Sequence, residues 1–121
     1  MNTRAKGKVI EKHAENILVQ DGWLVEKANP KLMFLGPGKM MSKAHDFWGR
    51  WDLIGVKDQQ AIFVQCSVKN HLGDKRKQVT GFPELGIQQI WIYIPGRGRH
   101  FEVYDRDDGY EEVVSKIEII K

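Results

Sequence analysis

The chain has 121 residues, which is enough for one hydrophobic core and too few for two, so we expect a single domain over residues 1–121. Hydrophobic residues make up 41% and charged residues 29%, which argues against intrinsic disorder, and a net charge of +3 favours a polyanionic partner only weakly. No apolar run approaches about 18 residues, no signal-peptide pattern stands at the N-terminus and the only cysteine is Cys66, so we expect a cytoplasmic protein with no membrane span and no internal disulfide bond.

The first half of the chain predicts one helix, one short strand and a long irregular segment. Apolar residues recur at helical spacing from about Arg4 to Gln20, and Asp21-Gly22 ends that pattern. The next apolar stretch, Trp23 to Lys27, has the length of a short strand. The segment from Asn29 to Arg50 is longer than most connections in compact domains, which indicates a functional loop.

The second half predicts strands around a single helix. Two strands, Asp52 to Val56 and Ala61 to Lys69, precede a helix from Lys75 to about Leu85, although Pro83 interrupts its pattern. Two further strands, Gln88 to Ile94 and His100 to Tyr104, form a hairpin, and the last segment, Val113 to Ile120, fits either a strand or a helix. This order of elements predicts an α/β protein.

A row of polar side chains on one predicted strand is the main functional signal. Because side chains alternate along an extended chain, Ile62, Val64, Cys66 and Val68 are expected on one face, and Phe63, Gln65, Ser67 and Lys69 on the other. Asp52 precedes Gln65 by 13 positions and begins the neighbouring strand, where it can lie beside this row. An acid, an oxygen ligand and a lysine on adjacent strands are the parts of a magnesium-dependent phosphodiesterase site.

Basic and aromatic residues flank the same region. Lys75, Arg76 and Lys77 follow the polar strand, and we expect them to hold phosphates without reading sequence. Arg50 lies between Trp48 and Trp51, directly before Asp52. The two tryptophans either stack on unpaired bases beside Arg50 or pack in the core, and the second interpretation is favoured for at least one of them.

These positions resemble a known family. The run Lys6-Gly7-Lys8-Val9-Ile10-Glu11, followed eleven residues later by Gly22-Trp23, is similar to the opening of the archaeal Holliday junction resolvases, a branch of the PD-(D/E)XK nuclease superfamily. The spacing from Asp52 to Ser67 is also that of the family, so the resemblance extends from about Arg4 to Tyr104.

The resemblance implies a restriction-endonuclease-like core, in which an N-terminal helix precedes a central mixed β-sheet flanked by helices. Its metal ligands would be Glu11, Asp52 and Gln65, holding Mg²⁺, with Mn²⁺ as a substitute. The apolar stripe of the helix favours Glu11 over Glu15, because Glu11 borders the buried face and Glu15 is expected to point towards water. The family also implies a homodimer that acts on branched or distorted DNA.

The chain departs from the family pattern at the strand motif (Asp/Glu)-X-Lys. On equal spacing Gln65 takes the place of the acid and Ser67 that of the lysine, so the catalytic ammonium is expected from Lys69, two residues further along. The alternative alignment places Ser67 at the acid position and Lys69 at the lysine position. Either way the site has one carboxylate fewer than usual, which predicts weak metal binding.

Three functions therefore remain as hypotheses. The first is a metal-dependent endonuclease in which Glu11, Asp52, Gln65 and Lys69 are catalytic and Arg50, Lys75, Arg76 and Lys77 hold DNA. The second is a nuclease fold without catalytic activity that acts as a DNA-binding or architectural protein, which the missing acid and the displaced lysine favour. The third is a small interaction module unrelated to nucleic acid.

Overall fold

The computed structural model describes residues 3–27, 32–36, 39–42 and 50–119, and the side chains of 7–27 and 50–119. Its elements run α1 (Thr3–Gln20), β1 (Leu24–Lys27), β2 (Leu32–Gly36), β3 (Lys39–Ser42), β4 (Leu53–Lys57), β5 (Gln60–Val68), η1 (Lys69–His71), α2 (Leu72–Val79), β6 (Ile87–Ile94), β7 (His100–Asp105), η2 (Arg106–Asp108) and β8 (Val113–Glu118). In the described part of the chain no helix is long and apolar enough to cross a membrane.

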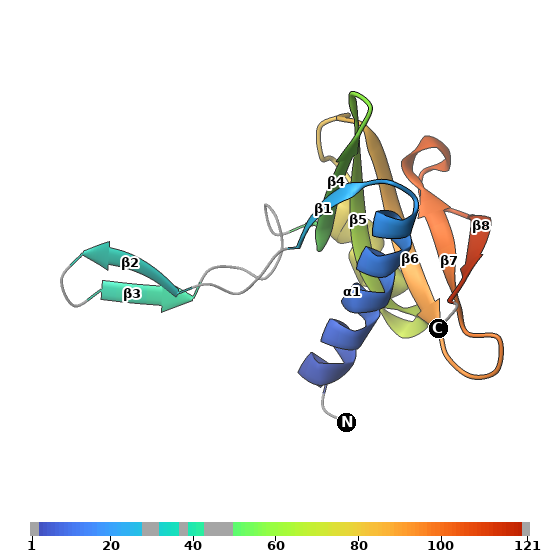
Figure 1. Cartoon of the computed structure of the whole chain (residues 1–121), viewed down its shortest axis with the longest axis horizontal. Helices are drawn as coiled ribbons and strands as arrows, with labels where there is room; N and C mark the ends of the chain where they lie inside the picture. The colour runs from blue at the N-terminus through green and yellow to red at the C-terminus, as the bar shows by residue number, and fades with distance from the viewer. Residues whose placement is uncertain (1–2, 28–31, 37–38, 43–49, 120–121) are drawn as a thin grey trace.

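The main sheet contains six strands in the order β1-β4-β5-β6-β7-β8, and β2 and β3 form a separate hairpin (Figure 1). Every neighbouring pair in the main sheet is antiparallel except β5 and β6, which are parallel. A parallel pair needs a crossover connection, and here η1 and α2 provide it. The protein is thus an α/β protein with a mixed sheet, as its order of elements predicts.

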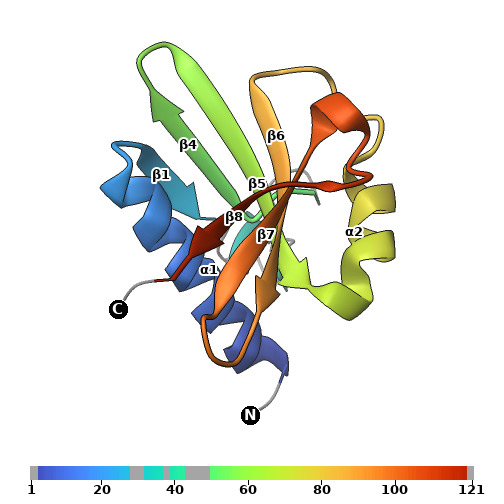
Figure 2. The same ribbon diagram turned by 90° about the vertical axis from the view of Figure 1, so that its right-hand side faces the viewer.

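The helices lie on opposite faces of the sheet, and each face has its own core (Figure 2). On the α1 face, Ile10, Ala14 and Leu18 pack against Val64, Cys66, Trp91 and Phe101. On the α2 face, Trp51, Phe63, Phe82 and Tyr104 surround Val79. The alternation predicted for β5 is confirmed, because Ile62, Val64, Cys66 and Val68 belong to the first core and Phe63 to the second.

Several predicted boundaries are wrong, and each has a local reason. β5 ends at Val68, where the chain leaves the sheet for η1, so Lys69 is not a strand residue. α2 ends at Val79 because Thr80 takes an extended conformation, well before the predicted end near Leu85. The last segment is a strand, β8. The segment predicted as an irregular loop contains β2 and β3, and Trp48 lies outside the described residues.

Gly86 sets the close approach of the crossover to β5. Its φ angle is +65°, in the left-handed region that favours glycine, and an added Cβ would collide with the carbonyl oxygen of Ala61. Ala61 begins the buried part of β5, one residue before the pairing of Ile62 with Ile87. Gly86 therefore directly precedes the first pair of the parallel register, Ile62 with Ile87, at a position that disfavours any side chain.

Candidate functional site

Asp52 lies at the entrance to β4 and is tied to β5. Its backbone N–H donates to the carbonyl oxygen of Val64 at 2.9 Å. Its side-chain Oδ2 accepts a hydrogen bond from the backbone N–H of Cys66 at 2.8 Å, in a buried position. A carboxylate that accepts a backbone N–H across two strands is held in one place, which is what a metal ligand or an electrostatic catalyst requires.

Cys66 is the point on which three charged side chains act. Burial raises the pKa of its thiol well above the usual value, and the negative charges of Asp52 and Glu11 raise it further, while the positive charge of Lys75 lowers it. Glu11 comes from α1, Asp52 from the entrance to β4 and Lys75 from α2. Charged residues separated widely in the sequence therefore act electrostatically on the C-terminal part of β5.

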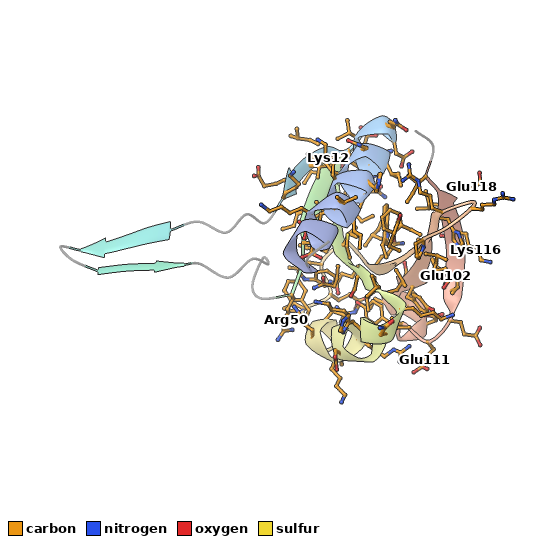
Figure 3. The ribbon with its side chains drawn as sticks, turned by 90° about the horizontal axis from the view of Figure 1, so that it is seen from below. Lys12, Arg50, Glu102, Glu111, Lys116 and Glu118 are labelled. Carbon is orange, nitrogen blue, oxygen red and sulfur yellow. The ribbon has the colours of Figure 1, made fainter. Side chains whose placement is uncertain are left out.

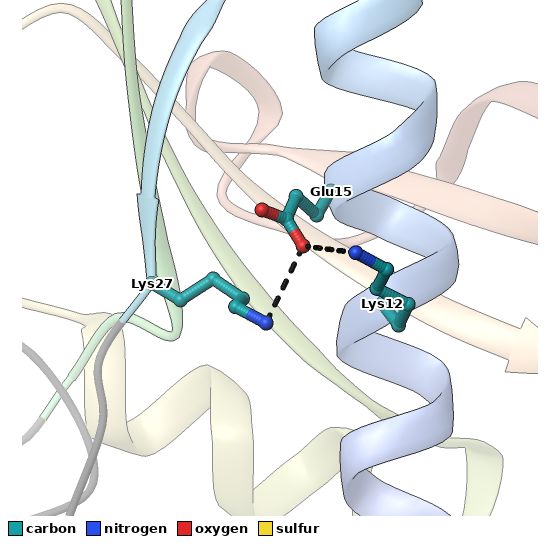
Figure 4. A network of polar contacts seen from close by, with 3 residues as sticks. All are labelled: Lys12, Glu15 and Lys27. Carbon is teal, nitrogen blue, oxygen red and sulfur yellow. Dashed lines mark hydrogen bonds and ion pairs between the residues drawn. The ribbon is translucent and has the colours of Figure 1, made fainter.

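Glu15, one turn after Glu11, has a different environment. Its carboxylate forms ion pairs with Lys12 and with Lys27 of β1, each at 3.4 Å (Figure 4). Its side chain is 21% exposed, so the carboxylate that was expected to point towards water is partly buried between two lysines. The choice of Glu11 as the helix acid stays a prediction.

The structure does not bring Gln65 to this group. Gln65 is fully buried, its Nε2 donates to the carbonyl oxygen of Arg50 at 2.6 Å, and its Oε1 has no hydrogen-bond partner among the described residues. As the neighbour of Cys66 on a strand, it points to the opposite face, towards the core of α2. The expectation that Gln65 shares a ligand set with Glu11 is thus not supported by the strand geometry.

The environments of Lys69 and Lys75 are the reverse of those expected. Lys69 lies in η1 and is exposed, because the strand has already ended. Lys75 is half-buried and its charge reaches Cys66, although the sequence assigned it only to flanking phosphates. The crossover through η1 and α2 places Lys75 close enough to the sheet for its charge to act on Cys66. The periodicity of the strand does not predict this position.

Of the other residues predicted to hold DNA, Arg50 and Arg76 contact groups within the protein and Lys77 is exposed. The guanidinium of Arg50 lies over the ring of Phe82, 5.7 Å from its centroid, and Trp51 is completely buried, so the core interpretation of Trp51 is confirmed. Arg76 donates from Nε and Nη2 to the carbonyl oxygen of Tyr110, at 3.0 and 2.7 Å. Arg76 therefore anchors the turn after η2, whereas Lys77 is exposed.

Glu11 and Asp52 are the two carboxylates whose charges act on Cys66. Among the described residues there is no group of three or more His, Cys, Asp or Glu side chains that could hold an ion. Mg²⁺, however, keeps several water ligands and is commonly held by one or two carboxylates together with substrate phosphates. Glu11 and Asp52 would be the two carboxylates of such a site.

A cleft on the α1 face lies apart from Glu11 and Asp52. It has a volume of about 570 Å³ and is lined by apolar residues of α1 and the sheet, among them Ile17, Trp23 and Trp91. Trp23 Nε1 donates to Asp21 at 3.2 Å and Trp91 Nε1 donates to Gln89 at 2.9 Å. The indole donors of its two tryptophans are already engaged, and Glu11 and Asp52 do not line it.

Comparison with protein-family models, with curated proteins and with solved structures gave no match for this chain.

Proposed function

We propose that the protein is a metal-dependent endonuclease with a restriction-endonuclease-like core, which hydrolyses phosphodiester bonds in branched or distorted DNA. The observation that carries this proposal is the buried carboxylate of Asp52, which accepts the backbone N–H of Cys66 at 2.8 Å beside a thiol whose pKa is influenced by the charges of Asp52, Glu11 and Lys75. Two carboxylates and an ammonium, supplied by three elements, are the charges that phosphoryl chemistry needs.

Each of these side chains has a definite role in the proposal. Glu11 and Asp52 would hold Mg²⁺, which supplies charge neutralisation at the scissile phosphate and a water ligand of lowered pKa. Lys75 would stabilise the negative charge that develops on the phosphate oxygens. Cys66 takes no part in catalysis, because its raised pKa keeps it a neutral thiol at pH 7 and therefore without repulsion towards phosphate.

The positive surface around the site supports a nucleic-acid partner. Lys69 and Lys77 are exposed on η1 and α2, the segments that precede and contain Lys75, although exposed Asp74 lies among them. Such groups bind phosphates irrespective of base sequence, which suits an enzyme that recognises DNA shape. Arg76 is left out of this surface because its guanidinium is bonded to the carbonyl of Tyr110.

The test is single-turnover cleavage of a four-way junction and of a plain duplex with Mg²⁺ or Mn²⁺. Asp52→Asn keeps an oxygen that can accept the Cys66 N–H but removes the charge, so we expect cleavage to fall by about 100-fold or more. DNA binding, measured in EDTA, should stay the same or tighten because a charge that repels phosphate is lost.

A matched pair of substitutions on α1 provides the control. Glu11→Gln should reduce cleavage as Asp52→Asn does, whereas Glu15→Gln, one turn away and engaged with Lys12 and Lys27, should leave it nearly unchanged. Equal losses in both variants would indicate a general effect on the helix. Full activity of Glu11→Gln and Asp52→Asn would remove both carboxylates from the mechanism.

A specific observation favours a second candidate, a DNA-binding protein without catalysis. Gln65 faces away from Cys66, and the described residues contain no three-ligand group for a metal ion. In that case the parent protein binds branched DNA in EDTA and leaves it intact after Mg²⁺ or Mn²⁺ is added. If the protein does not bind DNA at all, both candidates are contradicted. The remaining hypothesis is then a small interaction module unrelated to nucleic acid.

A further inference from the structure

β8 is an edge strand with one open side. It pairs with β7 on the inner side, and residues 113–116 and Glu118 are exposed. An edge strand presents a row of unpaired N–H and C=O groups, which is a template for pairing with another chain. The question is which chain fits the side chains of this edge.

The hydrogen bonds of the inner side identify the groups that point outwards. The N–H of Ile119 donates to the carbonyl oxygen of Arg99 at 3.1 Å, so Ile119 is bonded to the β7 side. In an antiparallel pair the direction of the backbone groups alternates along the strand. Glu118 and Lys116, one and three positions before Ile119, therefore direct their N–H and C=O groups away from β7.

We propose that β8 pairs with β8 of a second copy of the chain, antiparallel and with Ile117 at the two-fold axis. In this register Lys116 of each copy lies opposite Glu118 of the other, so the pairing forms two opposite-charge pairs. Both residues already direct their backbone groups outwards, as hydrogen-bonded partners must. A strand whose sequence complements itself in this way fits a symmetric dimer.

The same register continues a charge pattern that already exists in the main sheet. Within one copy Glu102 of β7 lies opposite Lys116, and His100 lies opposite Glu118. Figure 3 shows Glu102, Lys116 and Glu118 gathered on the β7–β8 side of the protein. Across the dimer the row would read Glu102, Lys116, then Glu118 and His100 of the second copy, so like charges do not face each other.

Other registers that satisfy the backbone are worse for the side chains. A shift of the partner by two residues places Lys116 opposite Lys116 of the second copy, and a shift by two in the other sense places Glu118 opposite Glu118. Like charges directly opposite each other are destabilising. The Lys116–Glu118 register is therefore the one selected by charge complementarity, and this argument is independent of the proposed function.

The test uses sedimentation equilibrium of the full chain at low salt. The parent protein is expected to show a monomer–dimer equilibrium. Lys116→Glu and Glu118→Lys each convert two attractive pairs into two repulsive ones, so each should raise the dimer Kd by about tenfold or more. An equimolar mixture of the two variants should restore dimerisation. In the heterodimer the two substituted side chains face each other with opposite charges, and the other pair is the original pair of Lys116 and Glu118.

The mixture separates the proposed contact from changes within one chain. Lys116→Glu also places two acids side by side on β7 and β8, but that repulsion is the same whether the variant is alone or mixed. Lys8→Glu and Glu84→Lys, at exposed positions away from β8, are matched controls and should leave the Kd unchanged. A parent protein that stays monomeric at millimolar concentration, or a mixture that dimerises no better than its components, would overturn the proposal.

Discussion

The carboxylate of Asp52 is held by the backbone N–H of Cys66, but the side chain beside it is not the one expected from the sequence. The sequence singled out Asp52, and the structure ties its carboxylate to the backbone of Cys66. The side chain next to that carboxylate is a buried thiol, while the amide of Gln65 is directed to the other face. Lys75 is the positive charge that acts on the same thiol, in opposition to the two carboxylates, so its substitution is informative.

We predict that Lys75→Ala lowers single-turnover cleavage of a four-way junction by about 100-fold, as loss of a transition-state charge partner does. Lys77→Ala, on the same helix but exposed, should change the rate by less than about threefold, because it can only contribute to binding through phosphate contacts. Binding in EDTA is measured for both variants. A large loss with Lys69→Ala and none with Lys75→Ala would return the catalytic role to Lys69.

At the scale of elements, the parallel pair of β5 and β6 is the feature on which the site depends. The crossover through η1 and α2 positions Lys75, and the register of the pair positions Cys66 between α1 and β4. The crossover returns to the sheet through Gly86, where there is no room for a side chain beside Ala61. Gly81, at the end of α2, also has a left-handed backbone but has open space around its Cα.

This pair of glycines gives a matched comparison. Gly81→Ala should cost about 1 kcal/mol of unfolding free energy, from backbone strain alone. Gly86→Ala combines the same strain with a collision in the closely packed crossover, so it should cost about 3 kcal/mol or more. Urea unfolding followed by circular dichroism measures both. Similar costs for the two variants would mean that the crossover can move away from β5.

At the scale of the whole molecule, both faces of the sheet bury groups that ionise at high pH. Burial raises the pKa of the Cys66 thiol on the α1 face, and on the α2 face it raises the pKa of Tyr104 and raises that of Tyr110 to about 12. The unfolded chain loses these protons at lower pH than the folded protein does. The stability that these groups contribute is therefore complete at neutral pH and is lost as the pH rises through their folded pKa values.

We predict that the free energy of unfolding begins to fall near pH 9, where the unfolded Cys66 thiol ionises, and falls further up to about pH 12, with Tyr110 contributing up to about 2 kcal/mol of the loss. The Tyr110 hydroxyl is buried and has no hydrogen-bond partner among the described residues, so Tyr110→Phe should be nearly neutral at pH 7. The variant should lose less stability than the parent at pH 11. An identical pH dependence in the two proteins would show that the hydroxyl ionises freely in the folded state.

The sequence by itself determined the first helix, most strands of the main sheet and the faces of β5, because these depend on local periodicity, whereas β2 and β3 were not predicted and β8 was left open between strand and helix. The helix ending at Gln20, the alternation along β5 and the hairpin of β6 and β7 were all predicted from spacing alone. The ends of β5 and α2 were not, because they depend on where the chain turns back to meet the sheet.

Only the tertiary structure decided which charged residues act on the same thiol. The charges of Glu11, Asp52 and Lys75 all act on Cys66 because α1 packs on the face that carries Cys66, and because a parallel crossover returns α2 to the end of β5. The spacing along the chain predicts Gln65 beside Asp52 as a metal ligand. It does not predict which face of the sheet α1 covers, and Gln65 lies on the face opposite to α1. The face that α1 covers is settled by the burial of apolar side chains on both faces at once, which is a property of the packed molecule.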